Sequence, residues 1–183
     1  MWKKLAIVAT SLVLVMGSAS CGRTDSAQPG ASETIKLSDS DVMFLQMMLP
    51  HHEQAIQMSD LALINTANEE VLLTAKSIKK LQNLEIQKMK SWLTEAGLPA
   101  AGHMMGEDGM MTDQQMTDLR AARGKDFDMQ YLSGMIVHHR GAIAMAQTEM
   151  EQGSNPKVKA MAAAIVVSQT AEVLAMVALR RHQ

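Results

Sequence analysis

Two segments of this chain repeat each other. Residues 41–93 align with residues 128–180 at a constant offset of 87 residues and without a gap. The likeness is strongest between MMLPHHEQAIQM, at residues 47–58, and GMIVHHRGAIAM, at residues 134–145. Six residues of the first segment, Met48, His51, His52, Ala55, Ile56 and Met58, recur as Met135, His138, His139, Ala142, Ile143 and Met145. A repeat of this length predicts a fold built from two copies of one structural unit.

Each copy has apolar residues at spacings of three and four, which is typical of helices. The predicted helices span residues 38–66 and 69–96 in the first copy and residues 127–152 and 156–181 in the second, with a short helix at residues 113–122 between the copies. Because a lone antiparallel hairpin cannot cover its apolar stripe, the two copies are expected to pack face to face. The sequence therefore predicts an all-α four-helix bundle made of two duplicated antiparallel helix hairpins, with both histidine-bearing helices in one core.

Local signals set the expected helix ends. They are Ser38 with Asp41 as a capping box, Gly97 with Pro99 after the second helix, Gly124 as a break before the third long helix, and Pro156 in the first turn of the last one. Pro50 lacks an N–H, so a kink costing roughly 3 kcal/mol is expected just before His51. Val137 occupies the equivalent position in the second copy, so a kink is not required in both.

The paired histidines are candidate metal ligands. On a helix, Met48, His51 and Met58 share one stripe, and His52 lies about 100° further round. Methionine alone is often a core filler. A doubled histidine between two methionines is better explained as a metal site, because buried imidazole nitrogens need partners. The second copy offers the same set, which is Met135, His138, His139 and Met145.

A polar pattern also recurs on the second helix of each copy. Gln82, Glu85 and Met89 match Gln169, Glu172 and Met176. Buried carboxylates are rare unless they are paired, so Glu85 and Glu172 are either solvated charges or partners that orient the histidines. Neither reading makes them catalytic.

The segment at residues 100–111 is rich in glycine and poor in core residues. It carries one imidazole and four thioethers, from His103, Met104, Met105, Met110 and Met111. Unremarkable loop sequence is one explanation. Capture of a soft metal ion by this loop explains the composition better.

The first residues are typical of an exported protein. In residues 1–20, Lys3 and Lys4 precede a short apolar run and then small residues, as in a signal peptide. Cleavage would leave Cys21 first, either as the lipidated residue of a lipoprotein or as the start of a soluble secreted form. Residues 21–37 are expected to form a flexible tether before the bundle, which spans residues 38–183. The predicted location is extracytoplasmic, with a lipid anchor at Cys21 as the one expected membrane contact.

Composition narrows the chemistry further. Cys21 is the only cysteine, which excludes an internal disulfide and a cysteine-based zinc or iron–sulfur site. The net charge of −2 offers no basic surface for nucleic acid. Methionine, by contrast, reaches 18 of 183 residues. Thioethers are soft and uncharged and suit Cu(I), while imidazole also accepts Cu(II).

The Met-flanked paired histidines, followed by the Gln, Glu and Met spacing, resemble the domain of unknown function 305 (DUF 305) family, over about residues 39–181. The resemblance implies a ferritin-like helical bundle exported by bacteria. It also implies copper binding at Met48, His51, His52 and Met58 and at Met135, His138, His139 and Met145.

Three functions remain open from the sequence. The favoured one is a copper-binding protein for buffering, delivery or tolerance, with copper ions and other copper-trafficking proteins as partners. A ferritin-like metal-dependent oxidoreductase is the second, although no Glu is followed by His three residues later, as di-iron bundles require. The third is a metal-free envelope-stress or interaction module. The sequence favours a role other than an enzyme.

Overall fold

The computed structural model describes residues 35–100 and 109–182. Within them the chain forms five helices and no strand, which are α1 (Asp39–Asn65), α2 (Glu69–Glu95), α3 (Asp113–Ala121), α4 (Gly124–Gln152) and α5 (Pro156–Arg180). The predicted all-α class is therefore confirmed. The expected signal peptide and tether, and His103, Met104 and Met105 of the predicted loop, lie outside the described residues.

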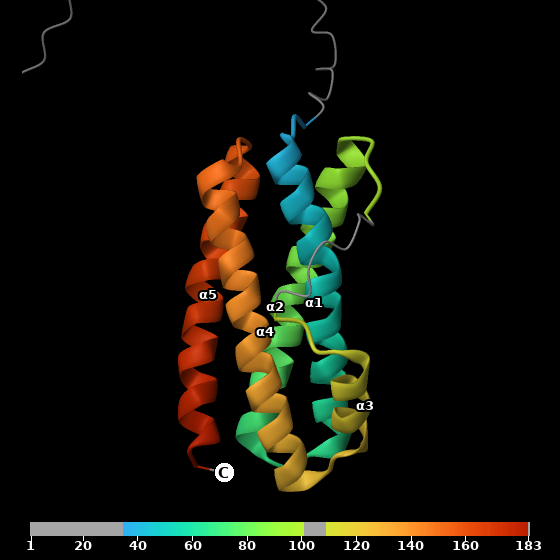
Figure 1. The fold of residues 1–183 in the computed structure, drawn as a ribbon, viewed down its shortest axis with the longest axis vertical. Helices are drawn as coiled ribbons and strands as arrows, with labels where there is room; N and C mark the ends of the chain where they lie inside the picture. Colours follow the sequence, from blue (N-terminus) through green and yellow to red (C-terminus); the bar gives the residue numbers. More distant parts are fainter. Residues whose placement is uncertain (1–34, 101–108, 183) are drawn as a thin grey trace, which may run out of the picture. The chain divides into compact units, whose positions relative to one another are not determined.

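The four long helices form the predicted bundle of two hairpins. α1 packs against α2 in the first hairpin, and α4 packs against α5 in the second. The hairpins meet mainly through α1 and α4, which run side by side in opposite directions, whereas α2 and α5 touch each other little (Figure 1). The short helix α3 lies beside α1 near the end of the bundle where α4 begins (Figure 1).

The capping signals predict most helix ends correctly. Ser38 caps α1 in a complete capping box with Asp41. Gly97 follows α2 in the left-handed region, with φ of 71°, and Pro156 occupies the first turn of α5. One end differs, because α4 begins at Gly124 rather than near Phe127. Gly124 has φ of 55°, and a glycine tolerates that angle, so the chain turns at this residue and continues directly into the helix.

Pro50 does not interrupt α1, which continues as a helix on both sides of it. The apolar helix α5 is long and apolar enough to cross a membrane by length and composition alone. It nevertheless buries Val158, Ile165 and Met176 against the rest of the bundle. α5 therefore contributes one face to the core, while Val167 and Leu174 on the rest of its surface are 73% and 67% exposed.

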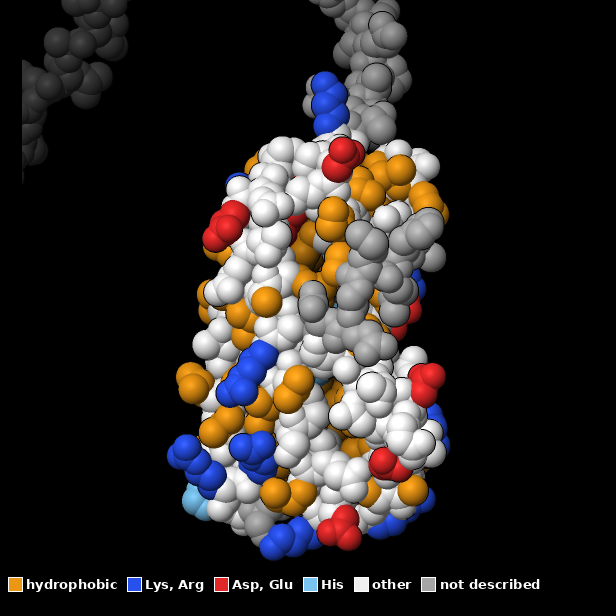
Figure 2. Space-filling model, viewed as in Figure 1, with side chains coloured by type: hydrophobic (Ala, Val, Ile, Leu, Met, Phe, Trp, Pro, Cys, Tyr) orange, Lys and Arg blue, Asp and Glu red, His pale blue; other side chains and the backbone are white. Residues whose placement is uncertain are grey.

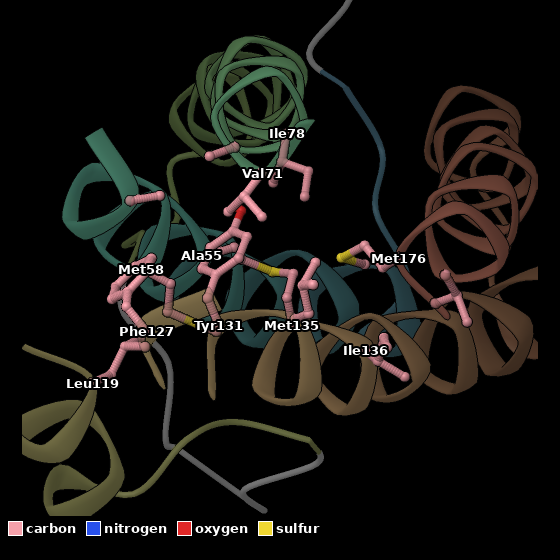
Figure 3. Close-up of a cluster of buried hydrophobic side chains, with 14 of the residues drawn as sticks. Ala55, Met58, Val71, Ile78, Leu119, Phe127, Tyr131, Met135, Ile136 and Met176 are labelled. Atoms are coloured by element: carbon pink, nitrogen blue, oxygen red, sulfur yellow. The ribbon is translucent and has the colours of Figure 1, made fainter. Parts of the chain in front are cut away.

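The buried side chains form two clusters at the two ends of the bundle. One contains Met58, Tyr131 and Met135, together with Leu119 of α3 (Figure 3). The other contains Phe44, Met48, Met89 and Leu93. Between the ends, where α1 and α4 cross the middle of the bundle, the buried side chains are polar, and they include four histidines.

Asp41 joins the start of α1 to the turn between α4 and α5. Its carboxylate accepts hydrogen bonds from the backbone N–H of Ser154 at 3.1 Å and of Asn155 at 3.0 Å. Burial would raise the pKa of Asp41, but hydrogen bonds from Ser38 and Asn155 outweigh it and hold the pKa well below its usual range. Burial, followed by the adjacent Asp41 carboxyl, raises the pKa of Glu149 to about 7.

Glu149 gives the fold a pH dependence that can be measured. Its folded pKa of about 7 exceeds the ordinary value of 4.5, so its contribution to stability is complete below pH 4.5 and is lost as the pH rises to about 7. We expect Glu149→Gln to flatten the fall in the free energy of unfolding between pH 5 and pH 8. Urea denaturation at both pH values measures this.

The exposed neighbour Glu151 provides the control, and Glu151→Gln should keep the slope of the parent. Asp41 does not interfere, because its depressed pKa places its effect below about pH 4. An unchanged slope in Glu149→Gln would contradict the assignment of the raised pKa to this residue.

Candidate metal centre

Four imidazoles form a row across the middle of the bundle. The rings of His51 on α1 and His138 on α4 are in contact, with 3.7 Å between their centroids and 39° between their planes. His52 lies 6.5 Å from His51, and His139 lies 6.4 Å from His138. All four side chains are at most 1% exposed. The two hairpins therefore bring their paired histidines together, as the repeat predicts.

A carboxylate closes each end of the row. The Nε2 atom of His52 is 2.8 Å from a carboxylate oxygen of Glu85 on α2, and the Nε2 atom of His139 is 2.8 Å from Glu172 on α5. Both pairs are 33 residues apart in sequence. The glutamate side chains are 12% and 19% exposed, so they face the protein more than the solvent. Of the two readings of these glutamates, this geometry supports orientation of the histidines.

The carboxylates fix how the outer histidines carry their protons. A carboxylate can only accept, so in a neutral imidazole the proton lies on Nε2 and the lone pair lies on Nδ1. The Nδ1 atoms of His52 and His139 are buried, and no hydrogen-bond partner for them occurs in the part of the chain that the structure describes. These two nitrogens are therefore basic, shielded from water and oriented, as metal-binding imidazoles are.

The surroundings of His138 favour its neutral form. Burial, followed by the neighbouring His51, His139 and His52, lowers the pKa of His138 well below its ordinary value of 6.5. A buried positive charge is costly, and a second charge on the adjacent ring would add repulsion. The neutral form of His138 is therefore favoured, which is the form of imidazole that binds metals.

The four methionines that flank the paired histidines do not lie together, and they occur toward both ends of the bundle. Met48 and Met135 are fully buried and lie one helical turn from the histidines, but in different core clusters. Met58 is fully buried near Tyr131 (Figure 3), and Met145 is half-buried at the opposite end of the bundle. Met58 and Met145 each lie seven residues beyond the first histidine of their own helix, or roughly 10 Å along it. The structure does not gather all four methionines around the histidines.

Two more methionines lie beside the row, and our sequence analysis did not count them as ligands. The His52–Glu85 pair sets the register of α1 against α2, so Met89, four residues after Glu85, is level with Met48, four residues before His52. Both lie in one cluster and are fully buried. In the second hairpin the His139–Glu172 pair sets the register in the same way, so Met176 is level with Met135, and both lie in one cluster. The repeat already pairs Met89 with Met176. The register between the two helices of each hairpin is needed to place them beside the histidines.

Buried amides accompany the glutamates. Gln82 and Gln169 lie one turn before Glu85 and Glu172 and are each 2% exposed. Within the described residues, neither the oxygen nor the nitrogen of either amide has a hydrogen-bond partner. Unpaired buried amides are costly, and their occurrence at equivalent positions of both copies indicates a polar interior beside the histidine row.

The described end of the predicted loop is anchored to the bundle. The side-chain amide of Gln54 donates to the Met111 carbonyl and accepts from the Met111 N–H, both at 2.8 Å. The Met111 thioether packs against the first core cluster, in the space that Gly134 leaves open. Met110 lines a neighbouring cavity of about 340 Å³ with Met111. Packing thus accounts for Met111, because a Cβ at Gly134 would lie 3.0 Å from its sulfur.

The ionisable side chains do not complete a metal site by themselves. Among the described residues, no group of three or more His, Cys, Asp or Glu side chains is arranged to hold an ion. The histidines occur as pairs, and each outer pair member already contacts a carboxylate. Buried methionines lie one helical turn from the histidines on α1 and α4.

The two glutamates can be tested through stability. Glu85→Ala or Glu172→Ala should lower the free energy of unfolding by about 1–3 kcal/mol, because each leaves a buried imidazole N–H without its acceptor. Glu53→Ala is the matched control, since Glu53 pairs with Lys90 at 2.7 Å on the surface, where such a pair contributes about 0–1 kcal/mol. Urea denaturation of metal-free protein measures all three. Equal effects at Glu85 and Glu53 would refute the orienting role.

Comparison with known proteins places this arrangement in a family. A DUF305 protein from Streptomyces coelicolor is 34% identical, over 76% of this chain and 89% of that one, with a TM-score of 0.73. A DUF305 fragment from Deinococcus radiodurans is 27% identical, over 81% and 100%, with a TM-score of 0.76. CopM in its Cu(I)-bound form is 29% identical, over 78% and 96%, with a TM-score of 0.69.

A curated relative matches a smaller part. Uncharacterized protein L153 from Acanthamoeba polyphaga mimivirus is 41% identical over 46 residues, which are 25% of this chain and 30% of that protein. The match thus spans less than a third of that relative's length. The model of the family described as Domain of unknown function (DUF305) matches residues 41–180, and this chain belongs to that family.

Proposed function

We propose that this chain is an exported copper-binding protein that holds Cu(I) and Cu(II) with histidine and methionine side chains of its bundle. Its role would be copper buffering, delivery or tolerance, with copper ions and copper-trafficking proteins as partners. CopM, which is similar over 78% of this chain, is known in Cu(I)-bound, Cu(II)-bound and silver-bound forms. That similarity supports metal binding, and the choice of site rests on the chemistry of this chain.

The observation that carries the proposal is the pair of oriented, buried Nδ1 atoms. Glu85 and Glu172 engage Nε2 of His52 and His139, which leaves Nδ1 of each as a lone-pair donor in a dry interior. A carboxylate on the far nitrogen makes imidazole a better metal ligand. A purely structural histidine would gain nothing from keeping its second nitrogen without a hydrogen bond.

The thioethers beside the row favour copper over zinc. Met48, Met89, Met135 and Met176 are buried and uncharged, and they surround a centre with no thiolate. Zn(II) prefers thiolate, imidazole and carboxylate, whereas Cu(I) accepts thioether readily. Imidazole serves both copper oxidation states. A mixed set of this kind can bind Cu(I) with sulfur and nitrogen and bind Cu(II) mainly with nitrogen.

Copper binding at the inner pair would require a local rearrangement. Metal–imidazole bonds are about 2.0–2.1 Å long, so an ion shared by His51 and His138 would turn apart two rings that are now 3.7 Å from each other. The bundle should therefore respond to the metal at its centre. This rearrangement of the central histidines should be visible by spectroscopy, and metal binding at the surface would not cause it.

Histidine and methionine substitutions should separate the two oxidation states. Met48→Leu with Met135→Leu roughly conserves volume, so each should cost less than about 1.5 kcal/mol of stability, while Cu(I) affinity falls. Replacing His51, His52, His138 and His139 by Gln should abolish most Cu(II) binding. Competition titration with a chelator, with Zn(II) as a reference ion, measures both. Cu(II) should also be released in acid, because imidazole must be neutral to bind.

Buried methionines remote from the histidines supply the control. Met116→Leu with Met161→Leu changes two core thioethers that are 7% and 9% exposed, and Cu(I) affinity should be unaffected. If the Met48 and Met135 variant binds Cu(I) as tightly as this control, those methionines are core packing. If Zn(II) displaces Cu(I) from the parent, the copper proposal is wrong.

Export is the second part of the proposal. Its support is the signal-like pattern of residues 1–20 and the description of the Streptomyces coelicolor neighbour as a candidate secreted protein. We expect mature protein from its native host to begin at Cys21. Mass spectrometry of the N-terminal peptide decides this and shows whether Cys21 is lipidated. Cytoplasmic protein that retains residues 1–20 would contradict export.

A further inference from the structure

A second group of thioethers lies at the end of the bundle where α1 begins and α4 ends. Met43 and Met47 on α1 and Met145 on α4 line one cavity of about 210 Å³. The remaining lining residues are Ser40, Phe44, Ala144, Thr148, Glu149 and Gln152. On each helix the side chains lie one turn apart, Met43 with Met47 and Met145 with Glu149, so α1 and α4 present facing pairs.

Core packing explains these methionines only in part, since Met145 packs against the second core cluster whereas Met43 and Met47 do not belong to it. The Met43 side chain is 55% exposed, and Met47 and Met145 are only partly buried. Exposed apolar side chains scattered singly are ordinary, but here three thioethers converge on one hollow. In Figure 2, hydrophobic side chains are visible at the surface toward this end of the bundle.

The two copies of the repeat differ at the position of this cavity. The position equivalent to Met47 is Gly134, and there the groove between α4 and α1 is filled by Met111. The equivalent of Met145 is Met58, whose methyl group also lies against Gly134. The segment before α3 thus covers one of the two equivalent grooves. The other groove has Met47 in place of the glycine, and its thioethers are exposed or partly buried.

We propose that Met43, Met47 and Met145 form a solvent-accessible site for a soft monovalent ion, Cu(I) or Ag(I), that is separate from the histidine centre. Three thioethers form a donor set that favours soft ions over Zn(II) and Mg(II). Met43 lies eight residues before His51 and Met145 lies seven residues after His138, roughly 10–12 Å along their helices, so one ion cannot be held closely by these two thioethers and by the histidines. Met47 is one turn before His51 and lines the end cavity with Met43 and Met145. Glu149 lines the same cavity. The choice of metal rests on the proposed function.

The direct test uses the unmodified full chain. Silver nitrate is titrated into protein carrying ¹³C-labelled methionine methyl groups, and each methyl resonance is assigned by single Met→Leu variants. The methyl signals of Met43, Met47 and Met145 should shift together along one saturation curve. Signals of the exposed Met129 and Met150, which lie outside the cavity, should not move.

Stoichiometry gives the second measurement. The triple variant Met43→Leu, Met47→Leu, Met145→Leu should bind one Cu(I) or Ag(I) fewer than the parent, whereas Met129→Leu with Met150→Leu should bind as many as the parent. His51→Gln with His138→Gln should retain the equivalent that shifts the three methyl signals. The silver titration is read on the labelled parent, with single Met→Leu variants used only for assignment, so poor folding of the triple variant would not obscure the result.

The outcomes separate this site from the histidine centre. If the histidine variants lose copper but the three methyl signals stay still on silver addition, the end site does not exist and the proposed function stands. If the parent binds neither Cu(I) nor Ag(I), both fail. If the three signals shift together and the histidine variants bind copper like the parent, the end site stands and the central one fails.

Discussion

The burial of four imidazoles between two carboxylates is the constraint on which the structure depends. Glu85 bonds to His52 and ties α2 to α1, the His51–His138 contact ties the two hairpins, and His139 bonds to Glu172 and ties α4 to α5. Polar groups in a dry core must be paired or they oppose folding. The row therefore fixes the register of all four long helices at once. Slipping one helix past its neighbour by a turn would leave a buried imidazole or carboxylate without its partner.

The two copies agree at the centre of the bundle and differ at its ends. Each centre has a His–Glu pair at a separation of 33 residues and a buried glutamine one turn away. At one end Asp41 holds the α4–α5 turn beside the buried Glu149, whose repeat equivalent is Ala62. At the other end Met111 fills the groove over Gly134, where the first copy has Met47. Divergence at the ends is compatible with the fold, because the central row already determines how the helices pack.

The repeat made the bundle and its histidine core predictable, because identical apolar spacing in two hairpins allows few ways to bury both. It also identified Glu85 and Glu172 as possible partners of histidine. The residues that would bind a metal ion were harder to predict from the sequence. A helical stripe treats Met48 and Met58 as equals, but three turns separate them, and the antiparallel partner places them in different clusters. The role of Met111 depends on the Gln54 amide, 57 residues away in sequence. The start of α4 at Gly124 depends on a positive φ that glycine permits but does not require.

Burial and ligand type together give the two candidate sites different physical behaviour. At the centre the proposed donors are imidazoles, of which His138 has its neutral form favoured by desolvation, and the contact between His51 and His138 would have to open before both could reach one ion. Metal affinity there is coupled to proton binding and to the packing that sets helix register. At the end of the bundle the donors are thioethers, which neither bind protons near neutral pH nor pair helices. An ion could reach them without disturbing the core, since Met43 already faces solvent. We therefore expect a metal ion to exchange quickly at the exposed thioethers and to be retained at the buried histidines. Under the proposed function, one bundle would supply both properties because its copies diverge only at the ends.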